Sequence, residues 1–277
     1  MEFSIWSGYH KTELEKNLLS CFMDETSKFH QACVYPIETG GKRIRPLFVF
    51  AAMECFGHSV DGNAMTVACA LELIHTYSLV HDDLPSMDND DYRRGKPTVH
   101  KQYNEAVAVL VGDALLTKAF TICASLPQDV LARIIHILGT AAGSVGMIGG
   151  QALDIGFEGS IIDMEKLLLL HKRKTGALIK VAVEMAGILC HVSQEEEEAL
   201  STYGAHIGLA FQLADDVLDA DEDAQDGGPP SFVKLLGIEE TKRLATENMD
   251  KAIQAIAHLP HPQYLIDLAK LTVFRTF

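Results

Sequence analysis

The chain has 277 residues, 48% of them hydrophobic, and its 38 acidic and 23 basic side chains give a formal net charge of −15. This acidic excess argues against a nucleic-acid partner, because phosphate backbones are bound by basic surfaces. The length and apolar content suffice for one large core. Since no Pro/Gly/Ser-rich linker, low-complexity tract or fixed-period repeat interrupts the sequence, a single domain over residues 1–277 is predicted.

Four segments carry helical signals, in chain order: 63–84, 105–126, 160–190 and 195–220. The first two are mostly apolar and stop before Pro85 and Pro127. The third opens with the capping-box pattern Ser160…Asp163, and the fourth begins with glutamates, which the helix dipole favours. Strand-like alternation is nowhere sustained. The predicted fold class is all-α, a bundle of about ten helices around a central cavity in which facing helices build a site.

The cysteines lie in apolar stretches without CxxC spacing: Cys21, Cys33, Cys55, Cys69, Cys123 and Cys190. This pattern indicates buried, reduced thiols rather than disulfides or zinc ligands, and it favours a cytoplasmic protein. The first residues have neither a secretory apolar core nor an Arg-rich transit character. No segment reaches about eighteen uninterrupted apolar residues, so a soluble protein without a membrane span is expected.

The segment HDDLPSMDNDDYRRGKPTVH, residues 81–100, holds five aspartates. Asp82 and Asp83 end their predicted helix, and the intervening LPSM is predicted to turn so that Asp88 folds back toward them. Either solvent screens such carboxylates on a loop or a multivalent cation neutralises them, and hard oxygen ligands of this kind suit Mg²⁺ paired with substrate phosphates. The residues that follow are interpreted as loop surface or helix cap: Asn89, Asp90 and Asp91.

A second acidic group lies in FQLADDVLD, residues 211–219. Asp215 and Asp219 are four residues apart and share a helix face, which Gln212 joins. Because the neighbouring residues are apolar, this carboxylate patch needs compensation, whereas the glutamates of 195–198 are interpreted as a solvated face. Two acidic groups facing each other would hold a diphosphate through bridging metal ions.

Six motifs occur in order between about residues 36 and 240: GGKRIRP, ELIHTYSLVHDDLPSMDNDDYRRGKPTVH, GDALLTKAF, GGQALDI, HKRKTG and GLAFQLADDVLD. In these motifs the chain resembles the trans-isoprenyl diphosphate synthases, specifically their bacterial farnesyl diphosphate synthase group. DDxxD alone is a weak signal, but DDxxxxD followed by RRGKPT, KTG and QxxDDxxD is very specific. The resemblance implies an isoprenoid-synthase-type bundle and a homodimer packed through central helices, with residues 105–124 as the candidate surface.

The resemblance implies two diphosphate sites, the first for isopentenyl diphosphate. Pro46 suits the first helical position, which places Lys42 and Arg45 beside a helix N-terminus that favours anions. His75 lies two turns before Asp82 on one helix face. By resemblance, the residues of this site are Gly41, Lys42, Arg45, His75 and Arg94.

The second site is for the allylic diphosphate (dimethylallyl or geranyl), and by resemblance Arg93, Lys174 and Thr175 bind it. Gln212 resembles the family glutamine that lies near the reacting end. Gln151 and Asp154 lie in GGQALD, where the glycines permit a close helix approach and the polar pair supports the site. For some neighbouring residues, phosphate contact and loop solvation remain alternatives: His81, Lys96, His100 and Lys101.

The implied mechanism needs metal ions and no protein base. Three Mg²⁺ ions would stabilise the departing diphosphate as the allylic C–O bond ionises. Isopentenyl diphosphate then attacks the cation, the released diphosphate takes the proton, and apolar walls exclude water. The implied metal ligands are Asp82, Asp83, Asp88 and Asp215, with Asp219 acting through water. Together with Arg93, Lys174 and Gln212, the first four of these are the predicted catalytic residues.

Tyr77 and Ser78, five and four residues before Asp82, are the predicted floor for the growing chain. A helix rises about 5.4 Å per turn, roughly one isoprene unit. By resemblance, a bulky aromatic residue at position 77 limits the product to farnesyl diphosphate. The alternatives are that Tyr77 is only core packing and that the product is geranylgeranyl diphosphate.

One departure from the family pattern follows the second acidic group. The family has a lysine-bearing loop there, whereas this chain reads DEDAQDGGPPSFVKLLG, with Pro229 and Pro230 near the expected lysine and Lys234 as its candidate substitute. Two rival functions also remain. A terpene cyclase would not need the second diphosphate site, and a non-catalytic prenyl synthase subunit would be expected to lose carboxylates from one group.

Overall fold

The structure is a computed structural model that describes residues 2–22, 27–157, 159, 163–220 and 230–274. The chain divides into two compact units. Unit 1 comprises Met1–Phe50 and Val60–Ile135, and unit 2 comprises Ala51–Ser59 and His136–Phe277. Two helices, α3 (Ile44–Cys55) and α7 (Gln128–Ala142), begin in unit 1 and end in unit 2. A single domain over residues 1–277 stays a prediction.

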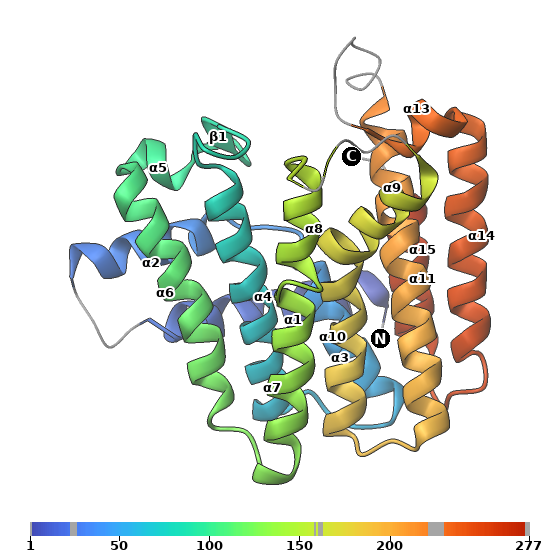
Figure 1. Ribbon diagram of the computed structural model, residues 1–277. Helices are drawn as coiled ribbons and strands as arrows, with labels where there is room; N and C mark the ends of the chain where they lie inside the picture. The colour runs from blue at the N-terminus through green and yellow to red at the C-terminus, as the bar shows by residue number, and fades with distance from the viewer. Residues whose placement is uncertain (1, 23–26, 158, 160–162, 221–229, 275–277) are drawn as a thin grey trace. The chain divides into compact units, whose positions relative to one another are not determined.

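Unit 1 is built around α4 (Gly62–Asp82), which packs against three other helices (Figure 1). Its elements besides α4 are α1 (Phe3–Ser20), α2 (Lys28–Glu38), β1 (Tyr92–Arg93), β2 (Lys96–Pro97), α5 (Val99–Gln102) and α6 (Glu105–Cys123). α4 is apolar around most of its circumference, as expected of a helix buried on several sides. The Asp61 side chain caps its start by accepting a hydrogen bond from the Ala64 N–H, 2.9 Å. The helix ends at Asp82, three residues before Pro85.

Unit 2 is built around α11 (Gln194–Leu218), which packs against both α10 and α14 (Figure 1). Its elements besides α11 are α8 (Met147–Asp154), α9 (Met164–His171), the π-helical turn η1 (Lys172–Gly176), α10 (Ala177–Leu189), α13 (Phe232–Leu236), α14 (Ile238–Ile256) and α15 (Gln263–Phe274). α11 begins with a capping box, in which Ser193 and Glu196 each accept a hydrogen bond from the other's backbone N–H. Of the glutamates at its start, predicted to form a solvated face, Glu195 and Glu198 are exposed, whereas Glu196 and Glu197 are half-buried.

The predicted all-α class is confirmed, and the predicted helices 63–84, 105–126 and 195–220 correspond to α4, α6 and α11. The predicted helix over 160–190 is present as a continuous helical run from Met164 to Leu189, but it is not α-helical throughout, because the π-helical turn η1 lies between α9 and α10. Ser160 of the predicted capping box lies outside the described residues. Asp163 is itself the N-cap of α9 and accepts a hydrogen bond from the Lys166 N–H, 2.9 Å.

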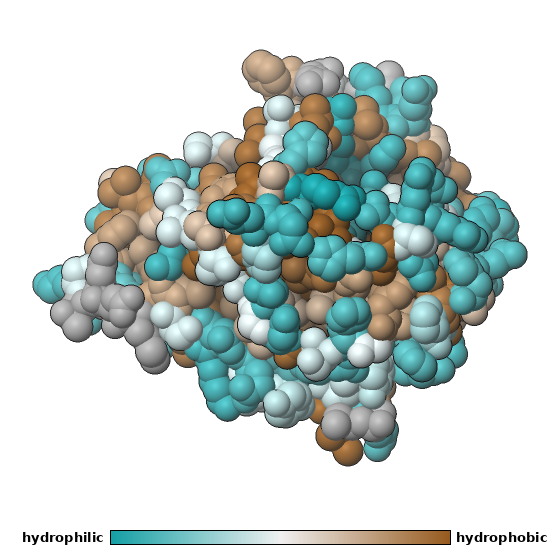
Figure 2. Space-filling model, turned by 90° about the horizontal axis from the view of Figure 1, so that it is seen from below, coloured by the Kyte–Doolittle hydropathy of each residue, from teal (hydrophilic) through white to brown (hydrophobic). Residues whose placement is uncertain are grey.

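The surface mixes polar and apolar residues, and Figure 2 shows hydrophobic patches between hydrophilic side chains on the face drawn there. By length and composition alone, the stretches Glu105–Cys123 and Gln128–Asp154 could cross a membrane. Core helices of soluble proteins pass the same test, so the absence of a membrane span stays a prediction. All six cysteines are free thiols, and four of them are buried, as the sequence indicated.

Candidate active site

The end of α4 brings the first three predicted carboxylates into one short segment. Residues 84–88 turn back on the helix, and the Asp88 N–H donates a hydrogen bond to the Asp82 carbonyl, 2.8 Å. The turn through LPSM is therefore confirmed. Asp82 is half-buried and Asp88 is exposed, whereas Asp83 is 3% exposed.

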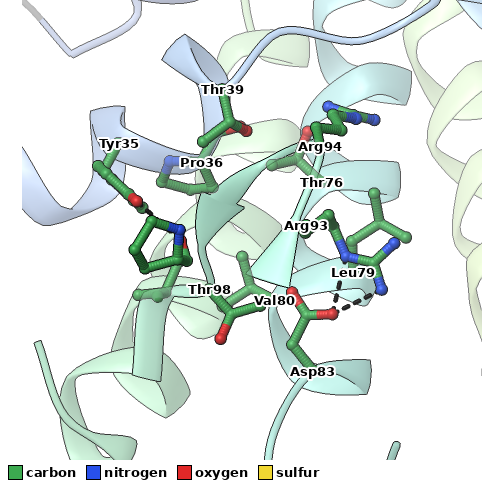
Figure 3. A pocket seen from close by; sticks show the side chains of 12 residues that line it. Tyr35, Pro36, Thr39, Thr76, Leu79, Val80, Asp83, Arg93, Arg94 and Thr98 are labelled. Atoms are coloured by element: carbon green, nitrogen blue, oxygen red, sulfur yellow. Dashed lines mark hydrogen bonds and ion pairs between the residues drawn. The ribbon is translucent and has the colours of Figure 1, made fainter. Parts of the chain in front are cut away.

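Asp83 is held by Arg93 of the short hairpin (Figure 3). Arg93 Nε donates to Asp83 Oδ1 at 2.7 Å, and the same guanidinium lies 3.5 Å from an Asp90 oxygen. Burial raises the pKa of the Asp83 carboxyl, and the Arg93 hydrogen bond partly opposes this shift. The hairpin is fastened to α2, because the Tyr35 hydroxyl donates to the Pro97 carbonyl at 2.7 Å. Arg93, predicted to bind the allylic diphosphate, thus occupies a fixed place beside an acidic residue.

The loop before α3 is organised by a residue that the sequence analysis did not single out, Arg43. Its guanidinium is buried and donates to Glu72 at 2.8 Å and to the Ile37 carbonyl at 2.7 Å. Because Arg43 turns into the core with a positive φ of 52°, Lys42 beside it is left exposed. The helix starts at Ile44, so Pro46 is its third residue and not its first. Proline is tolerated there because first-turn N–H groups have no intrahelical partner.

Four of the predicted isopentenyl diphosphate residues meet in unit 1. Arg94 Nη1 donates to the Gly40 carbonyl, and a methyl group at Gly41 would lie only 2.8 Å from that guanidinium. The second glycine of the motif therefore leaves room for Arg94. Arg45 Nη1 lies 3.2 Å from His75 Nε2, and because arginine can only donate, this nitrogen is the acceptor. Burial and the nearby arginines lower the pKa of His75 well below its usual range, so the imidazole is neutral.

Tyr77 lies on α4 with 5% of its surface exposed, and its hydroxyl has no hydrogen-bond partner among the described residues. Burial, with a smaller effect of Asp82, raises the pKa of Tyr77 to about 12. Its ring meets the His81 ring edge-on at 5.8 Å between centroids. His81 Nε2 is 3.0 Å from the Val109 carbonyl on α6, and α6 has no room for a Cβ at Gly112 against the His81 ring. His81 therefore joins α4 to α6, which is neither of the roles considered for it from sequence.

Lys174 lies in the π-helical turn of unit 2 and pairs with Asp154 of α8. α8 approaches this turn at Gly150, where an added Cβ would collide with the Lys174 backbone. The predicted close helix approach at GGQALD is thus present. Gln151 of the same motif is half-buried, and neither end of its amide has a partner among the described residues.

Thr175 begins a chain of hydrogen bonds that ends at a buried carboxylate. Thr175 Oγ1 donates to Gln212 Oε1 at 3.1 Å, and Gln212 Nε2 donates to Asp216 Oδ1 at 2.8 Å. The other oxygen of Asp216 accepts from the Phe232 N–H at 2.7 Å. Asp216 thus fixes Gln212 and the start of α13 at the same time.

Asp216 is the residue that sequence reasoning missed. Gln212 was grouped with Asp215 by a spacing of three, but its amide pairs with Asp216, four residues away. The signal was present, because positions four apart lie on one face and Asp216 is flanked by apolar residues. Its 6% exposure shows that it points inward, away from its neighbour Asp215.

Asp215 and Asp219 lie at the end of α11, where the Asp219 N–H donates to the Asp215 carbonyl at 2.9 Å. Among the described residues, no group of three or more His, Cys, Asp or Glu side chains is close enough to hold a metal ion as the side chains stand. The oxygen donors nevertheless fit Mg²⁺ chemically, since three carboxylates share one turn in unit 1 and two share a helix end in unit 2. That the two groups face each other stays a prediction.

The remaining candidates have mainly local contacts. Ser78 Oγ donates to the His75 carbonyl at 2.9 Å, and Lys101 pairs with Asp91 at 2.7 Å. His100 is buried beside the Thr98 hydroxyl, 3.1 Å, and Lys96 is exposed on β2. Lys234 is exposed on α13, so whether it replaces the loop lysine stays a prediction. Pro229 lies outside the described residues.

The chain is similar to known proteins in family, in sequence and in fold. The family described as "Polyprenyl synthetase" matches residues 26–232. The chain belongs to the polyprenyl synthetase family. It is 40% identical to the farnesyl diphosphate synthase of Micrococcus luteus over 258 residues, 89% of this chain and 88% of that protein. It is 39% identical to the chloroplastic geranylgeranyl pyrophosphate synthase of Catharanthus roseus, over 91% of this chain and 75% of that one.

Solved structures agree with this family membership. An apo FPP/GFPP synthase from Zymomonas mobilis has a TM-score of 0.90 at 36% identity and covers 98% of both chains. The geranyltransferase of Helicobacter pylori has a TM-score of 0.89 at 31% identity, covering 99% of this chain and 100% of that one. This member of the polyprenyl synthetase family is therefore a trans-prenyl diphosphate synthase, and its product length is a separate question.

Proposed function

We propose that the protein condenses isopentenyl diphosphate with dimethylallyl and geranyl diphosphates to give farnesyl diphosphate and diphosphate. The observation that carries the proposal is on α4, where His75, which contacts Arg45 of α3, lies on the same helix that ends at Asp82 and is followed by Asp83. A basic diphosphate site thus adjoins an acidic one, and a reaction between two diphosphate substrates requires both.

The acidic residues would hold Mg²⁺. The ligands would be Asp82, Asp83, Asp88, Asp215 and Asp219, all of them hard oxygen donors. When bound, the metal supplies positive charge that stabilises the departing diphosphate. Arg93 contacts Asp83 through Oδ1, so Asp83 would bind a metal ion through its other carboxylate oxygen, and the exposed part of the Arg93 guanidinium would bind the allylic diphosphate.

The chain's own residues bind and orient the two substrates. Lys42, Arg45 and Arg94 provide fixed positive charge for isopentenyl diphosphate, and neutral His75 can donate one hydrogen bond from Nδ1. Lys174 and Thr175 bind the allylic diphosphate, with Asp154 and Gln212 holding them in place. The proton lost after condensation goes to the released diphosphate, since no protein base is required.

Tyr77 supports the fifteen-carbon product. Its ring is buried on α4 between one and two turns before Asp82, and His81, anchored on α6, packs against it. A bulky ring on a fixed support limits the space for a growing chain. The alternative product is geranylgeranyl diphosphate, which the names of relatives at similar identity favour equally.

We also propose a cytoplasmic homodimer that packs through residues 105–124 of α6. Val109 and Leu110 on this helix are 42% and 54% exposed, and an interface with a second copy would bury both apolar side chains. The six free thiols are consistent with a reducing compartment.

Product analysis tests the proposal. Dimethylallyl diphosphate and radiolabelled isopentenyl diphosphate are incubated with the enzyme with and without Mg²⁺, and the dephosphorylated products are separated by chromatography. Mg²⁺-dependent farnesol is expected. Mainly twenty-carbon alcohol would reassign the product, a cyclic hydrocarbon would indicate a terpene cyclase, and no product would indicate a non-catalytic subunit.

A further inference from the structure

Unit 2 carries a groove of about 630 Å³ that is separate from the residues of the proposed active site. The residues that line it come from the segment before α8 and from α9, η1, α10, α11 and α14, and they include Val145, Leu168, Leu169, Lys172, Arg173 and Ala205. The volume is within the range of small-molecule sites, roughly 300–1,000 Å³.

The groove has apolar walls and a basic end. Leu168 and Leu169 each expose 37% of their surface and Val145 exposes 62%, so an apolar chain could bury them. None of the described lining residues is acidic, although the chain has 38 acidic against 23 basic residues. Lys172 and Arg173 form no ion pair with any described residue. Their charge is therefore available to an anion.

The other polar side chains that line the groove already have partners within the protein. Lys180 is paired with Glu184 at 2.9 Å, so it contributes less to anion binding. Asn248 Nδ2 donates to the Leu244 carbonyl, and its Oδ1 accepts from His206 Nδ1 at 2.9 Å. This wall is held in place by internal hydrogen bonds, so the basic end at Lys172 and Arg173 remains the place for an anionic group.

The basic end of the groove and the allylic site share one structural element, η1. Lys172 and Arg173 line the groove, and the next two residues of the same π-helical turn are Lys174, which pairs with Asp154, and Thr175, which bonds Gln212. π-helical turns are rare and occur frequently at functional sites. If a ligand displaces Lys172 and Arg173 at the start of η1, the displacement must either be absorbed within this five-residue turn or be passed on to Lys174 and Thr175.

Tight packing limits how much of that displacement the turn can absorb. Gly176 at its end contacts Gly208 of α11, where an added Cβ would lie 2.6 Å from the Gly176 Cα. Leu209, the next residue, lines the groove and packs against the cluster of Leu167, Leu213 and Phe232. With its end held in this way, a displacement of Lys172 or Arg173 would be passed to Lys174 and Thr175.

We propose that this groove binds a single-chain amphipathic anion, with an isoprenoid or alkyl tail along its leucines and a phosphate or diphosphate head at Lys172 and Arg173, and that binding there weakens the allylic site through η1. The regulatory half rests on the proposed function, whereas the binding half does not. Two sources share this chemistry, a free prenyl diphosphate such as the enzyme's own product and a phosphorylated lipid in a membrane.

The binding half is tested by calorimetric titration with dodecyl phosphate below its micelle concentration, in EDTA without Mg²⁺, so that metal-dependent binding is absent. One site per chain is expected. Arg173→Glu, which reverses the charge, and Ala205→Trp, which fills the groove at an exposed position, should each raise the Kd at least about tenfold, or 1.4 kcal/mol. Lys270→Glu, the same charge reversal at an exposed α15 residue outside the groove, should leave the Kd unchanged.

Inorganic diphosphate has the anionic head without a tail, and dodecyl maltoside has the same tail with a neutral head. Each should bind at least tenfold more weakly than dodecyl phosphate. Absence of dodecyl phosphate binding, or equal losses in Lys270→Glu and the groove variants, overturns the proposal. The source is then identified by competition with farnesyl diphosphate in solution and by flotation with phosphatidylcholine vesicles that contain the single-chain lipid lysophosphatidic acid, each compared between the wild type and Arg173→Glu.

The regulatory half is tested by steady-state kinetics with Mg²⁺. Dodecyl phosphate should raise the KM for dimethylallyl diphosphate several-fold in the wild type and not in Ala205→Trp, whose activity without the ligand should match the wild type. An unchanged KM at saturating dodecyl phosphate overturns the link through η1. If the chain transfers no prenyl group at all, the calorimetric result still decides whether the site exists.

Discussion

Neighbouring aspartates of this chain have different environments. Asp82 is half-buried at the end of α4, whereas Asp83 is buried and paired with Arg93. Asp215 is half-buried at the end of α11, and Asp216 is buried beneath the start of α13. Adjacent residues on a helix point about 100° apart, so one member of each pair is more open to solvent while the other also anchors a neighbouring element, the hairpin for Asp83 and α13 for Asp216.

Replacing Asp82 or Asp215 with alanine is expected to remove most turnover. Each change removes a proposed metal ligand and, with it, stabilisation of the departing group, an effect on the scale of about 10²- to 10³-fold in kcat. Turnover is measured with saturating Mg²⁺ and helicity by circular dichroism. Asp91→Ala is the control, since Asp91 is exposed and its carboxylate pairs with Lys101 on the protein surface. Full activity in Asp215→Ala would make the second acidic group a surface patch.

Asp216→Ala is expected to lower the free energy of unfolding. It leaves the Phe232 N–H and the Gln212 amide without their acceptor, and a buried unsatisfied donor costs about 1–3 kcal/mol. Denaturant unfolding measures the change. Asp219→Ala, at the exposed end of the same helix, should have little effect on stability, and an equal loss in both variants would argue against a specific role for Asp216.

At the scale of elements, α4 combines several functions in one helix. It carries the histidine of the isopentenyl diphosphate site, the proposed chain-length floor and the first aspartates: Tyr77 follows His75 by two residues and precedes Asp82 by five. Because its sides are packed by other helices, these side chains have fixed spacings. α6 contributes to the floor through the Val109 carbonyl and Gly112, which hold His81.

Product length should respond to both helices. Tyr77→Ala is expected to shift the main product from farnesyl toward geranylgeranyl diphosphate without abolishing turnover, because removing the ring opens room for about one isoprene unit, the rise of one turn. Gly112→Ala should displace His81 and, with it, the Tyr77 ring, changing the product ratio without touching Tyr77. Chromatography of the dephosphorylated alcohols gives both results. A fifteen-carbon product from Tyr77→Ala would show that Tyr77 is core packing.

At the scale of the whole molecule, the two units hold different parts of the proposed site. Unit 1 contains the isopentenyl diphosphate residues and the first aspartates, whereas unit 2 contains Lys174, Gln212 and the second aspartates. The matched family region, residues 26–232, includes most of both units. The family match therefore covers predicted site residues in both units.

The proposed dimer is tested by one substitution in α6. Leu110→Glu should convert the protein from dimer to monomer in sedimentation velocity, because a carboxylate would be buried unpaired in the interface. Leu271→Glu is the matched control, since Leu271 is 39% exposed on α15. A wild-type monomer, or a Leu110→Glu dimer of unchanged stability, would be inconsistent with this interface.

The sequence by itself determined the all-α class, the main helices, the turn that returns Asp88 to α4 and the family. These features depend on neighbouring residues: helical periodicity, prolines that end helices, and motifs whose order and spacing are specific. The close approach at GGQALD was also predictable, because only glycine admits a backbone at that distance.

Tertiary structure decided the features that depend on residues far apart in the chain. Arg43 turns inward because Glu72, 29 residues away, is buried beside it. His81 joins α4 to α6 because the Val109 carbonyl accepts its hydrogen bond. The π-helical turn η1 lies in the expected helix at the place where Gly150 of α8 and Gly208 of α11 pack closely against it. Local propensity carries no information on such partners, since they are brought together only when the helices pack.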